Sequence, residues 1–321
     1  MLRADAAAER RRAARQIGFS RRAGLLVAGA SGGSALLAAA VVAGALAVTF
    51  ALAWPSLRAA PLSFLGGASW DPSTRVFGAL PLIAGSALTT TVAIFLASPI
   101  ALGAAFFLGE VAPRESRPIL DAVLDLATAI PSVVWGLFAL DVILPALASH
   151  LYPVIYGDRA AEVSPGGFGL LSGGIVLAAM IVPTIAGVAR EVVRAVPDGD
   201  REAAIALGAT RWEVVRLVVL PPARAGLVGA VLLGLGRAVG EATVMSMILG
   251  GRAQIPTALA SPGATSSSLL LDQLAEATDP PHVAALGHVA LALLLASLLS
   301  HAVARLLVAR STTARAARGL P

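Results

Sequence analysis

The chain has 321 residues, of which 57% are hydrophobic and only 13% are charged, with a net charge of +5 and a mean hydropathy of +0.82. A soluble domain has roughly 25% charged residues, so this composition excludes a soluble globular protein and indicates a chain that crosses a membrane several times as helices. The absence of cysteine excludes disulfides and thiolate metal sites, and the four histidines lack the spacing of metal ligands.

Six apolar stretches exceed the roughly 20 residues that a helix needs to cross a bilayer. The predicted fold class is therefore an all-α polytopic membrane protein. The first stretch is about twice as long as the apolar core of a signal peptide, roughly 7–15 residues, which predicts a retained helix. Residues 54–76, which follow it, are predicted to form an exposed loop. The expected spans cover residues 24–53, 77–108, 119–148, 169–189, 225–249 and 282–308.

Arginine is unevenly distributed between the connecting segments, and the chain contains no lysine. Six spans place alternate segments on opposite sides, so 19 of the 24 arginines share the side of the two termini and 4 lie on the other. Basic residues are retained in the cytoplasm. We therefore expect both termini to be cytoplasmic, as an Arg-rich tail at residues 1–23 and a short tail at 311–321, together with the polar segment 190–224.

This polar segment, between the fourth and fifth spans, contains the motif Glu202-Ala203-Ala204, then Gly208 after three residues, Val218 after nine more, and Leu220-Pro221. Gly208 is predicted to separate two short helices, because glycine adopts positive φ without steric cost, and Pro221 is predicted to end the segment. The motif resembles the EAA loop of ABC-importer permeases, which in that family docks into a groove of the ATPase subunit. The resemblance implies a coupling role for Glu202, Ala203, Ala204, Gly208, Arg211, Leu220 and Pro221.

The absence of lysine also bears on catalysis. A P-loop uses its lysine to reach the β- and γ-phosphates of a nucleotide, so this chain has no Walker A site. We expect no catalytic residues, no metal and no cofactor in the chain, and ATP hydrolysis by a separate partner subunit.

The fifth span contains an arginine and a glutamate, Arg237 and Glu241. An ionised side chain near the bilayer centre costs about 2.5–3.5 kcal/mol on the insertion scale, and a spacing of four residues allows the two to pair on one helix face. In one interpretation they neutralise each other and serve only packing. In the other, Arg237 contacts an anion in transit, because guanidinium donors suit oxyanions, and Glu241 weakens its grip.

Further candidates for this substrate pathway are Thr243 and, more weakly, Ser132. Pro99, Pro131 and Pro183 lie within predicted spans, where packed kinks are the simpler interpretation. The carboxylates Asp121 and Asp125 are expected near a cytoplasmic helix end, exposed to solvent.

Other segments resemble the permeases of phosphate-specific ABC importers. They are the stretch opening at Phe77-Gly78-Ala79-Leu80-Pro81, the stretch Leu108-Gly109-Glu110-Val111-Ala112-Pro113, and Ala129-Ile130-Pro131-Ser132 with its continuation to Leu137. Residues 234–243 are more similar to the PstC-type than to the PstA-type subunit, with Ala242 inserted where Thr usually follows the Glu.

This resemblance covers about residues 24–310, with a core at about 77–308, and implies a type I importer permease in a bacterial inner membrane. It implies three protein partners: a PstA-type second permease, a cytoplasmic ATPase in two copies and an extracytoplasmic phosphate-binding protein. The chain is also expected to contact the lipid bilayer and not to bind nucleic acid. The alternatives are a permease for another oxyanion, such as molybdate, sulfate or phosphonate, or a self-contained secondary transporter or channel.

Overall fold

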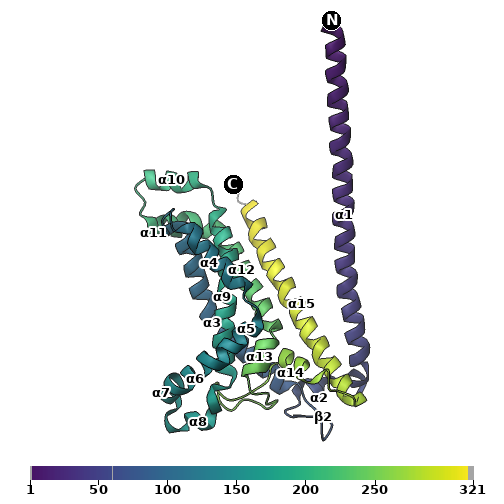
Figure 1. Ribbon diagram of the computed structural model, residues 1–321, viewed down its shortest axis with the longest axis vertical. Helices are drawn as coiled ribbons and strands as arrows, with labels where there is room; N and C mark the ends of the chain where they lie inside the picture. Colours follow the sequence, from purple (N-terminus) through teal and green to yellow (C-terminus); the bar gives the residue numbers. More distant parts are fainter. Residues whose placement is uncertain (1, 60, 317–321) are drawn as a thin grey trace. The chain divides into compact units, whose positions relative to one another are not determined.

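The computed structural model describes residues 2–59 and 61–316 (Figure 1). The side chains of both expected tails, residues 1–23 and 311–321, lie outside the described set. The chain divides into two units, Met1–Ala51, which consists of most of helix α1 (Leu2–Ala59), and Leu52–Pro321.

Six helical runs in the described part of the chain are long and apolar enough to cross a membrane, which confirms the predicted number and fold class. Their limits differ most from expectation in the third and fifth runs. The runs are Ser31–Ala59, Leu80–Val111, Ser132–Val163, Pro165–Arg194, Arg211–Gly240 and Pro280–Val303.

Helix α9 (Leu170–Arg194) lies at the centre of the second unit, between α3 (Leu80–Phe106) and α12 (Leu220–Gly240). Glycines allow this close packing. A Cβ added at Gly174 would lie 2.6 Å from Val92 of α3, and one added at Gly234 of α12 would lie 2.4 Å from Ile185. Small residues at helix contacts are the usual means of packing in a membrane, where the hydrophobic effect does not drive association.

The expected third span is divided at a proline. Helix α4 (Arg117–Ala129) ends before Ile130, whose ψ of 122° is extended, and α5 (Ser132–Phe138) begins after Pro131. The ring of a proline disfavours helical ψ in the preceding residue, so Pro131 separates two helices where we predicted a kink within one span. The chain then continues through η2 (Ala139–Ile143), α6 (Leu144–Ala146), η3 (Leu147–Leu151), α7 (Tyr152–Tyr156), η4 (Gly157–Arg159), α8 (Ala160–Val163) and η5 (Pro165–Gly167).

Residues 54–76 are mostly exposed, as predicted, but they are not a simple loop, and Phe64 and Trp70 within them are buried. They contain α2 (Pro61–Gly66) and most of a hairpin of β1 (Trp70–Asp71) and β2 (Val76–Phe77). Trp70 is 7% exposed, and its indole Nε1 donates to Oε1 of Gln273 in α14 (Ser266–Gln273) at 3.0 Å. Aromatic rings with a polar edge are stable in such half-polar sites.

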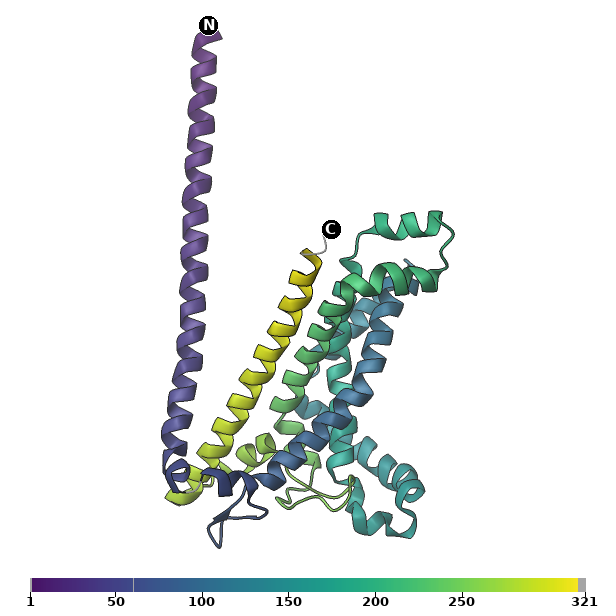
Figure 2. The ribbon, with the colours of Figure 1, turned by 180° about the vertical axis from the view of Figure 1, so that it is seen from behind.

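The polar segments gather at two ends of this unit. Both views place α10 (Asp198–Ala206) and α11 (Arg211–Glu213) at the end where α4 begins and α9 finishes (Figures 1 and 2). Helices α6, α7 and α8 lie at the opposite end, where α15 (Pro280–Ala316) begins. Residues of η1 (Phe107–Val111) extend α3 toward the α10 end.

Candidate functional site

The segment 190–224 forms the bent structure that its sequence predicts. Helix α10 finishes at Ala206, Gly208 has a φ of +89°, and α11 begins at Arg211. Thr210 and Glu213 form a reciprocal capping box, in which the Thr210 hydroxyl accepts from the backbone N–H of Glu213 at 3.3 Å. A cap of this kind contributes roughly 1 kcal/mol and holds the second helix at a defined start. The predicted role of Gly208 as the separator is confirmed.

This segment exposes large apolar side chains. Leu207 is 90% exposed, Trp212 69% and Leu217 67%. Large apolar side chains of this kind are more often buried within a protein. Apolar groups gathered on one surface commonly mark a site of protein contact. Of the predicted coupling residues, Ala204 is half-buried and packs against the core, and the others are exposed: Glu202, Ala203, Gly208, Arg211, Leu220 and Pro221.

Pro221 does not end the segment, contrary to our prediction. The helix runs without interruption from Arg211 to Gly240, through the π-helical turn η6 (Val214–Val219) into α12. A proline lacks a backbone N–H, and its ring clashes with the carbonyl four residues earlier. The wider π-turn immediately before Pro221 is a known way in which a helix accommodates such a defect.

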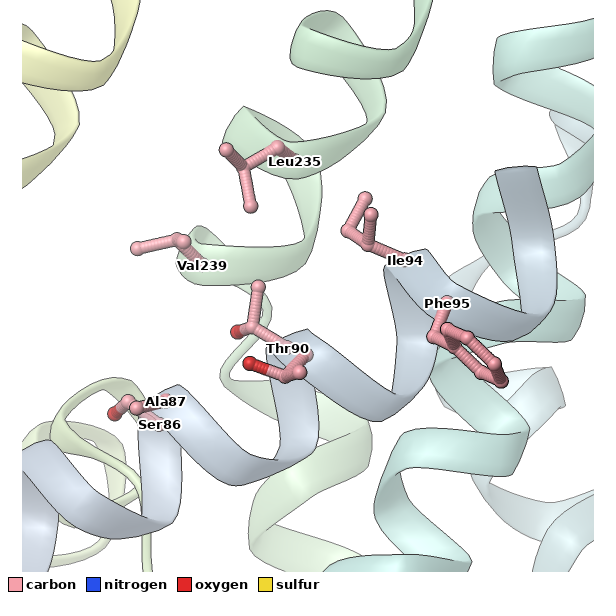
Figure 3. A pocket seen from close by; sticks show the side chains of 8 residues that line it. Ser86, Ala87, Thr90, Ile94, Phe95, Leu235 and Val239 are labelled. Carbon is pink, nitrogen blue, oxygen red and sulfur yellow. The ribbon is translucent and has the colours of Figure 1, made fainter.

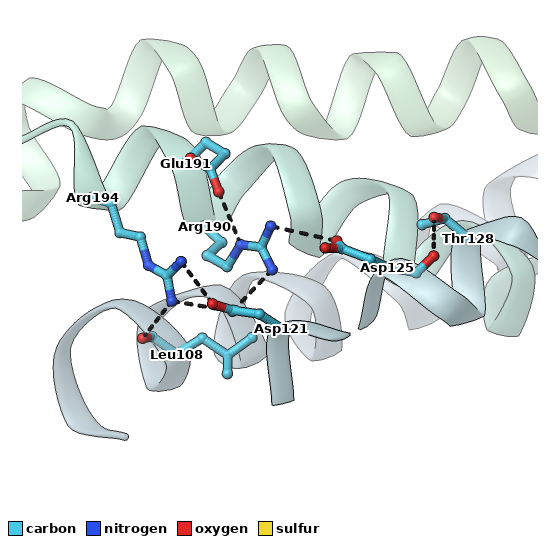
Figure 4. Close-up of polar contacts among 7 residues, drawn as sticks. All are labelled: Leu108, Asp121, Asp125, Thr128, Arg190, Glu191 and Arg194. Atoms are coloured by element: carbon cyan, nitrogen blue, oxygen red, sulfur yellow. Dashed lines mark hydrogen bonds and ion pairs between the residues drawn. The ribbon is translucent and has the colours of Figure 1, made fainter. Parts of the chain in front are cut away.

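Two arginines of α9 bind one carboxylate of α4 at this end of the unit (Figure 4). Arg190 Nη1 donates to Asp121 Oδ1 at 2.9 Å, and Arg194 Nη1 donates to Asp121 Oδ2 at 3.0 Å. Arg190 is 8% exposed and also contacts the more exposed Asp125 at 3.5 Å. The expectation that Asp121 is exposed was wrong, because its partners lie 69 and 73 residues away and no local pattern reveals them.

The charges of these arginines determine the ionisation of Asp121, which lies before the third membrane run. Burial alone would raise the pKa of this carboxyl, but the hydrogen bond from Arg194 and the charges of Arg190 and Arg194 outweigh burial. The pKa therefore lies below its ordinary value, and the carboxylate is ionised at neutral pH.

We expect Asp121→Asn to lower the free energy of unfolding by about 1–3 kcal/mol, because it leaves two arginines without their shared charged acceptor. Thermal unfolding of the detergent-purified subunit measures this loss. Asp125→Asn is the matched control, since its side chain is 66% exposed, and we expect a change within about 0.5 kcal/mol. Equal effects of the two substitutions would contradict the assignment of Asp121 as the main acceptor.

Arg237 and Glu241 lie at a break between two helices, and they do not pair. Arg237 is in the last turn of α12, where its Nη1 donates to the Thr184 hydroxyl at 3.1 Å. Glu241 follows the helix, and its carboxylate accepts from the backbone N–H of Val244 in α13 (Thr243–Ile248) at 3.2 Å. The positive charge therefore lies at a helix C-terminus and the negative charge at a helix N-terminus, which is the favourable arrangement for both dipoles.

The two remaining candidates for the substrate pathway, Thr243 and Ser132, each lie at the start of a helix. Thr243 begins α13, and Ser132 begins α5, which packs against α13, with Met247 filling the space above Gly136. Within the described residues, no hydrogen bond joins Ser132 to Arg237, Glu241 or Thr243. The sequence did not predict the contribution of α14, whose Ser267 hydroxyl donates to the backbone oxygen of Glu241 at 2.8 Å and holds the break.

A cavity of about 480 Å³ lies between α3 and α12 (Figure 3). Its lining is mostly apolar, and Arg237 is not part of it, although Leu235 and Val239 of the same helix are. Its hydroxyls alone provide no charge to bind an anion. The lining residues are Ser86, Ala87, Thr90, Thr91, Ile94, Phe95, Leu235 and Val239. Among the residues with described side chains, no group of three or more His, Asp or Glu is placed to hold a metal ion.

Solved structures with a similar fold include two of the MetNI methionine ABC transporter in inward-facing conformations. One matches with a TM-score of 0.52 and 22% identity, covering 71% of this chain and 93% of the matched chain. The other has a TM-score of 0.54 and 21% identity, covering 76% and 99%. At this identity the likeness establishes the fold alone.

Curated relatives are more similar in sequence. The phosphate transport system permease protein PstC of Haemophilus influenzae is 40% identical over 233 residues, covering 70% of this chain and 74% of the relative. That of Mesorhizobium japonicum is 34% identical over 285 residues, covering 86% and 87%. PstC 1 of Mycobacterium tuberculosis is 39% identical over 252 residues, covering 74% of each.

The family model for inner membrane components of binding-protein-dependent transport systems matches residues 97–313, which include both the bent segment and the helix break. With six membrane-crossing runs and relatives aligned over most of its length, this multi-pass membrane protein belongs to the family of binding-protein-dependent transport system inner membrane components.

Proposed function

We propose that this chain is the PstC-type permease subunit of an ATP-driven importer of inorganic phosphate. The observation that carries the proposal is its 34–40% identity to several PstC permeases over most of its length. The exposed apolar side chains of α10, α11 and the π-turn support a soluble partner at this segment. That partner would be the ATPase, because the segment has the spacing of an EAA motif.

In this proposal the chain carries out no bond chemistry. ATP binding closes the ATPase dimer, the bent segment follows it, and α9 and α12 move with the segment. The pathway then opens outward, and hydrolysis returns it to the inward-facing state. Phosphate shifts this equilibrium only through its different affinity for the two states. A PstA-type permease completes the pore, and an extracytoplasmic protein delivers phosphate.

The proposed membrane is the bacterial inner membrane, with both termini and residues 190–224 in the cytoplasm. The excess of arginine on that side supports this orientation. It places α10 and α11 where ATP is available.

Reconstituted proteoliposomes test the function. We expect uptake of labelled phosphate only when the second permease, the ATPase, ATP and the binding protein are all present. A preference for molybdate, sulfate or phosphonate would change the proposed substrate but would leave the proposed role as an importer permease unchanged. Uptake of phosphate by this chain without any ATPase would identify a secondary transporter or channel instead.

A further inference from the structure

A mostly buried ion pair joins the bent segment to η1, which extends α3. Arg201 in α10 and Glu110 in η1 are 91 residues apart, and the guanidinium contacts the carboxylate through two nitrogens. Its Nη2 donates to Glu110 Oε1 at 2.8 Å, and its Nε donates to the same oxygen at 3.1 Å. A planar guanidinium held in this way resists rotation, which a single lysine contact would not.

The same guanidinium binds the end of α9. Arg201 Nη2 donates to the carbonyl oxygen of Val193 at 2.8 Å, and Nη1 donates to that of Val196. These carbonyls belong to the last turn of α9 and the residues after it, where a helix leaves its acceptors unsatisfied. One side chain of α10 therefore touches the ends of both α9 and α3.

The burial of this pair distinguishes it from its neighbours. The side chains of Arg201 and Glu110 are 13% and 11% exposed, whereas Asp198, which also contacts Arg201, is 91% exposed. A charge pair removed from water is sensitive to the loss of either member, because the remaining charge stays buried. Exposed pairs such as Arg201 with Asp198 contribute little.

The next residue along α10 has the opposite environment. Glu202 is exposed and makes no hydrogen bond or ion pair within the described part of the chain. Glu202 and Ala203 are thus available to a partner, whereas Arg201 is directed inward to α3 and α9. Adjacent residues of one helix therefore have different surroundings, with Arg201 bound within the subunit and Glu202 exposed.

We propose that Arg201 and Glu110 form the joint through which movement of α10 reaches α3. This inference rests on the proposed function, since it assumes that the ATPase moves α10. Helix α3 packs along α9 and α12 and lines the cavity between α3 and α12. A displacement of α10 that pulls on Glu110 therefore moves a helix that borders the centre of the permease. Arg201 and Glu110 are positioning residues and do not contact the substrate.

A double-mutant cycle tests the joint in the reconstituted complete transporter. The variants are Glu110→Gln, which keeps the shape and removes the charge, Arg201→Gln, and the two together. The readout is phosphate transported per ATP hydrolysed, with ATPase recovery in a pull-down and the melting temperature measured alongside. We expect each single variant to retain the ATPase and to lose transport per ATP by at least about fivefold. We expect the double variant to lose no more than either single variant, because the two groups act as a unit.

Glu115→Gln is the matched control, since Glu115 is exposed in the connection after η1 and has no partner in the described chain. We expect this variant to transport as much phosphate per ATP hydrolysed as the unmodified complex. The proposal would be overturned if Glu110→Gln left transport per ATP unchanged, or if the losses of the two single variants added in the double variant. A lower melting temperature and weaker ATPase recovery with unchanged transport per ATP would show a merely structural pair. If the unmodified complex moves no phosphate, the proposed function fails instead.

Discussion

Gly208→Asp is expected to reduce recovery of the ATPase with this subunit by at least about tenfold, equivalent to ~1.4 kcal/mol of binding free energy. Gly208 has a φ of +89°, and a side chain there costs about 1–2 kcal/mol of backbone strain. The space around it is open within the subunit, so the added carboxylate would project from the surface beside Leu207. Strain displaces α11 relative to α10, and the new charge must be desolvated in any interface.

A pull-down of the ATPase from the membrane complex measures this effect, with uptake of phosphate as a second readout. Gly157→Asp is the matched control, because Gly157 also has positive φ (+58°) and open surroundings but follows α7, which lies at the opposite end of the unit. We expect this control to retain the ATPase. A complex with Gly208→Asp that assembles and transports normally would refute docking at this turn.

Arg237→Gln is expected to reduce phosphate uptake by about ten- to a hundredfold, since a hydrogen bond to a charged group contributes about 1.5–3 kcal/mol. Arg237 has one hydrogen bond in the described structure, to Thr184, and no carboxylate partner, so its other donors are free for an anion. Glutamine retains a donor for Thr184 but removes the charge. Binding of the ATPase is expected to persist, because Arg237 is in the last turn of α12, whereas the bent segment is at the start of that helix.

Thr184→Val separates the two roles of Arg237. It removes the hydrogen bond to the guanidinium and keeps the charge, so we expect uptake to fall by less than about threefold, equivalent to ~0.7 kcal/mol, which is within the range of an ordinary hydrogen bond. Uptake and ATP turnover are measured in the same vesicles for both variants. Normal transport and coupling by Arg237→Gln would show that the arginine serves only to neutralise the C-terminal dipole of α12.

Local patterns were sufficient for the features that depend on neighbouring residues. Apolar length alone predicts six membrane runs, because each span must satisfy its own backbone hydrogen bonds. Likewise, a glycine between two helix-forming stretches predicts the turn at Gly208, where positive φ favours glycine in any context. The proposed coupling residues between Glu202 and Pro221 come from the resemblance of a spaced motif of about twenty residues, and their role stays a prediction.

Contacts between distant segments were decided only by the tertiary structure. A spacing of four residues suggested that Arg237 pairs with Glu241, yet the helix stops between them, and each charge lies at a separate helix end. Asp121 was expected to be exposed, yet packing brings it to Arg190 and Arg194. Packing likewise brings Glu110 to Arg201. Spacing along the chain shows which residues can share a helix face. Only the packing of helices determines which charged side chains are removed from water together. The energy of an ion pair depends on this desolvation, so it cannot be predicted from spacing.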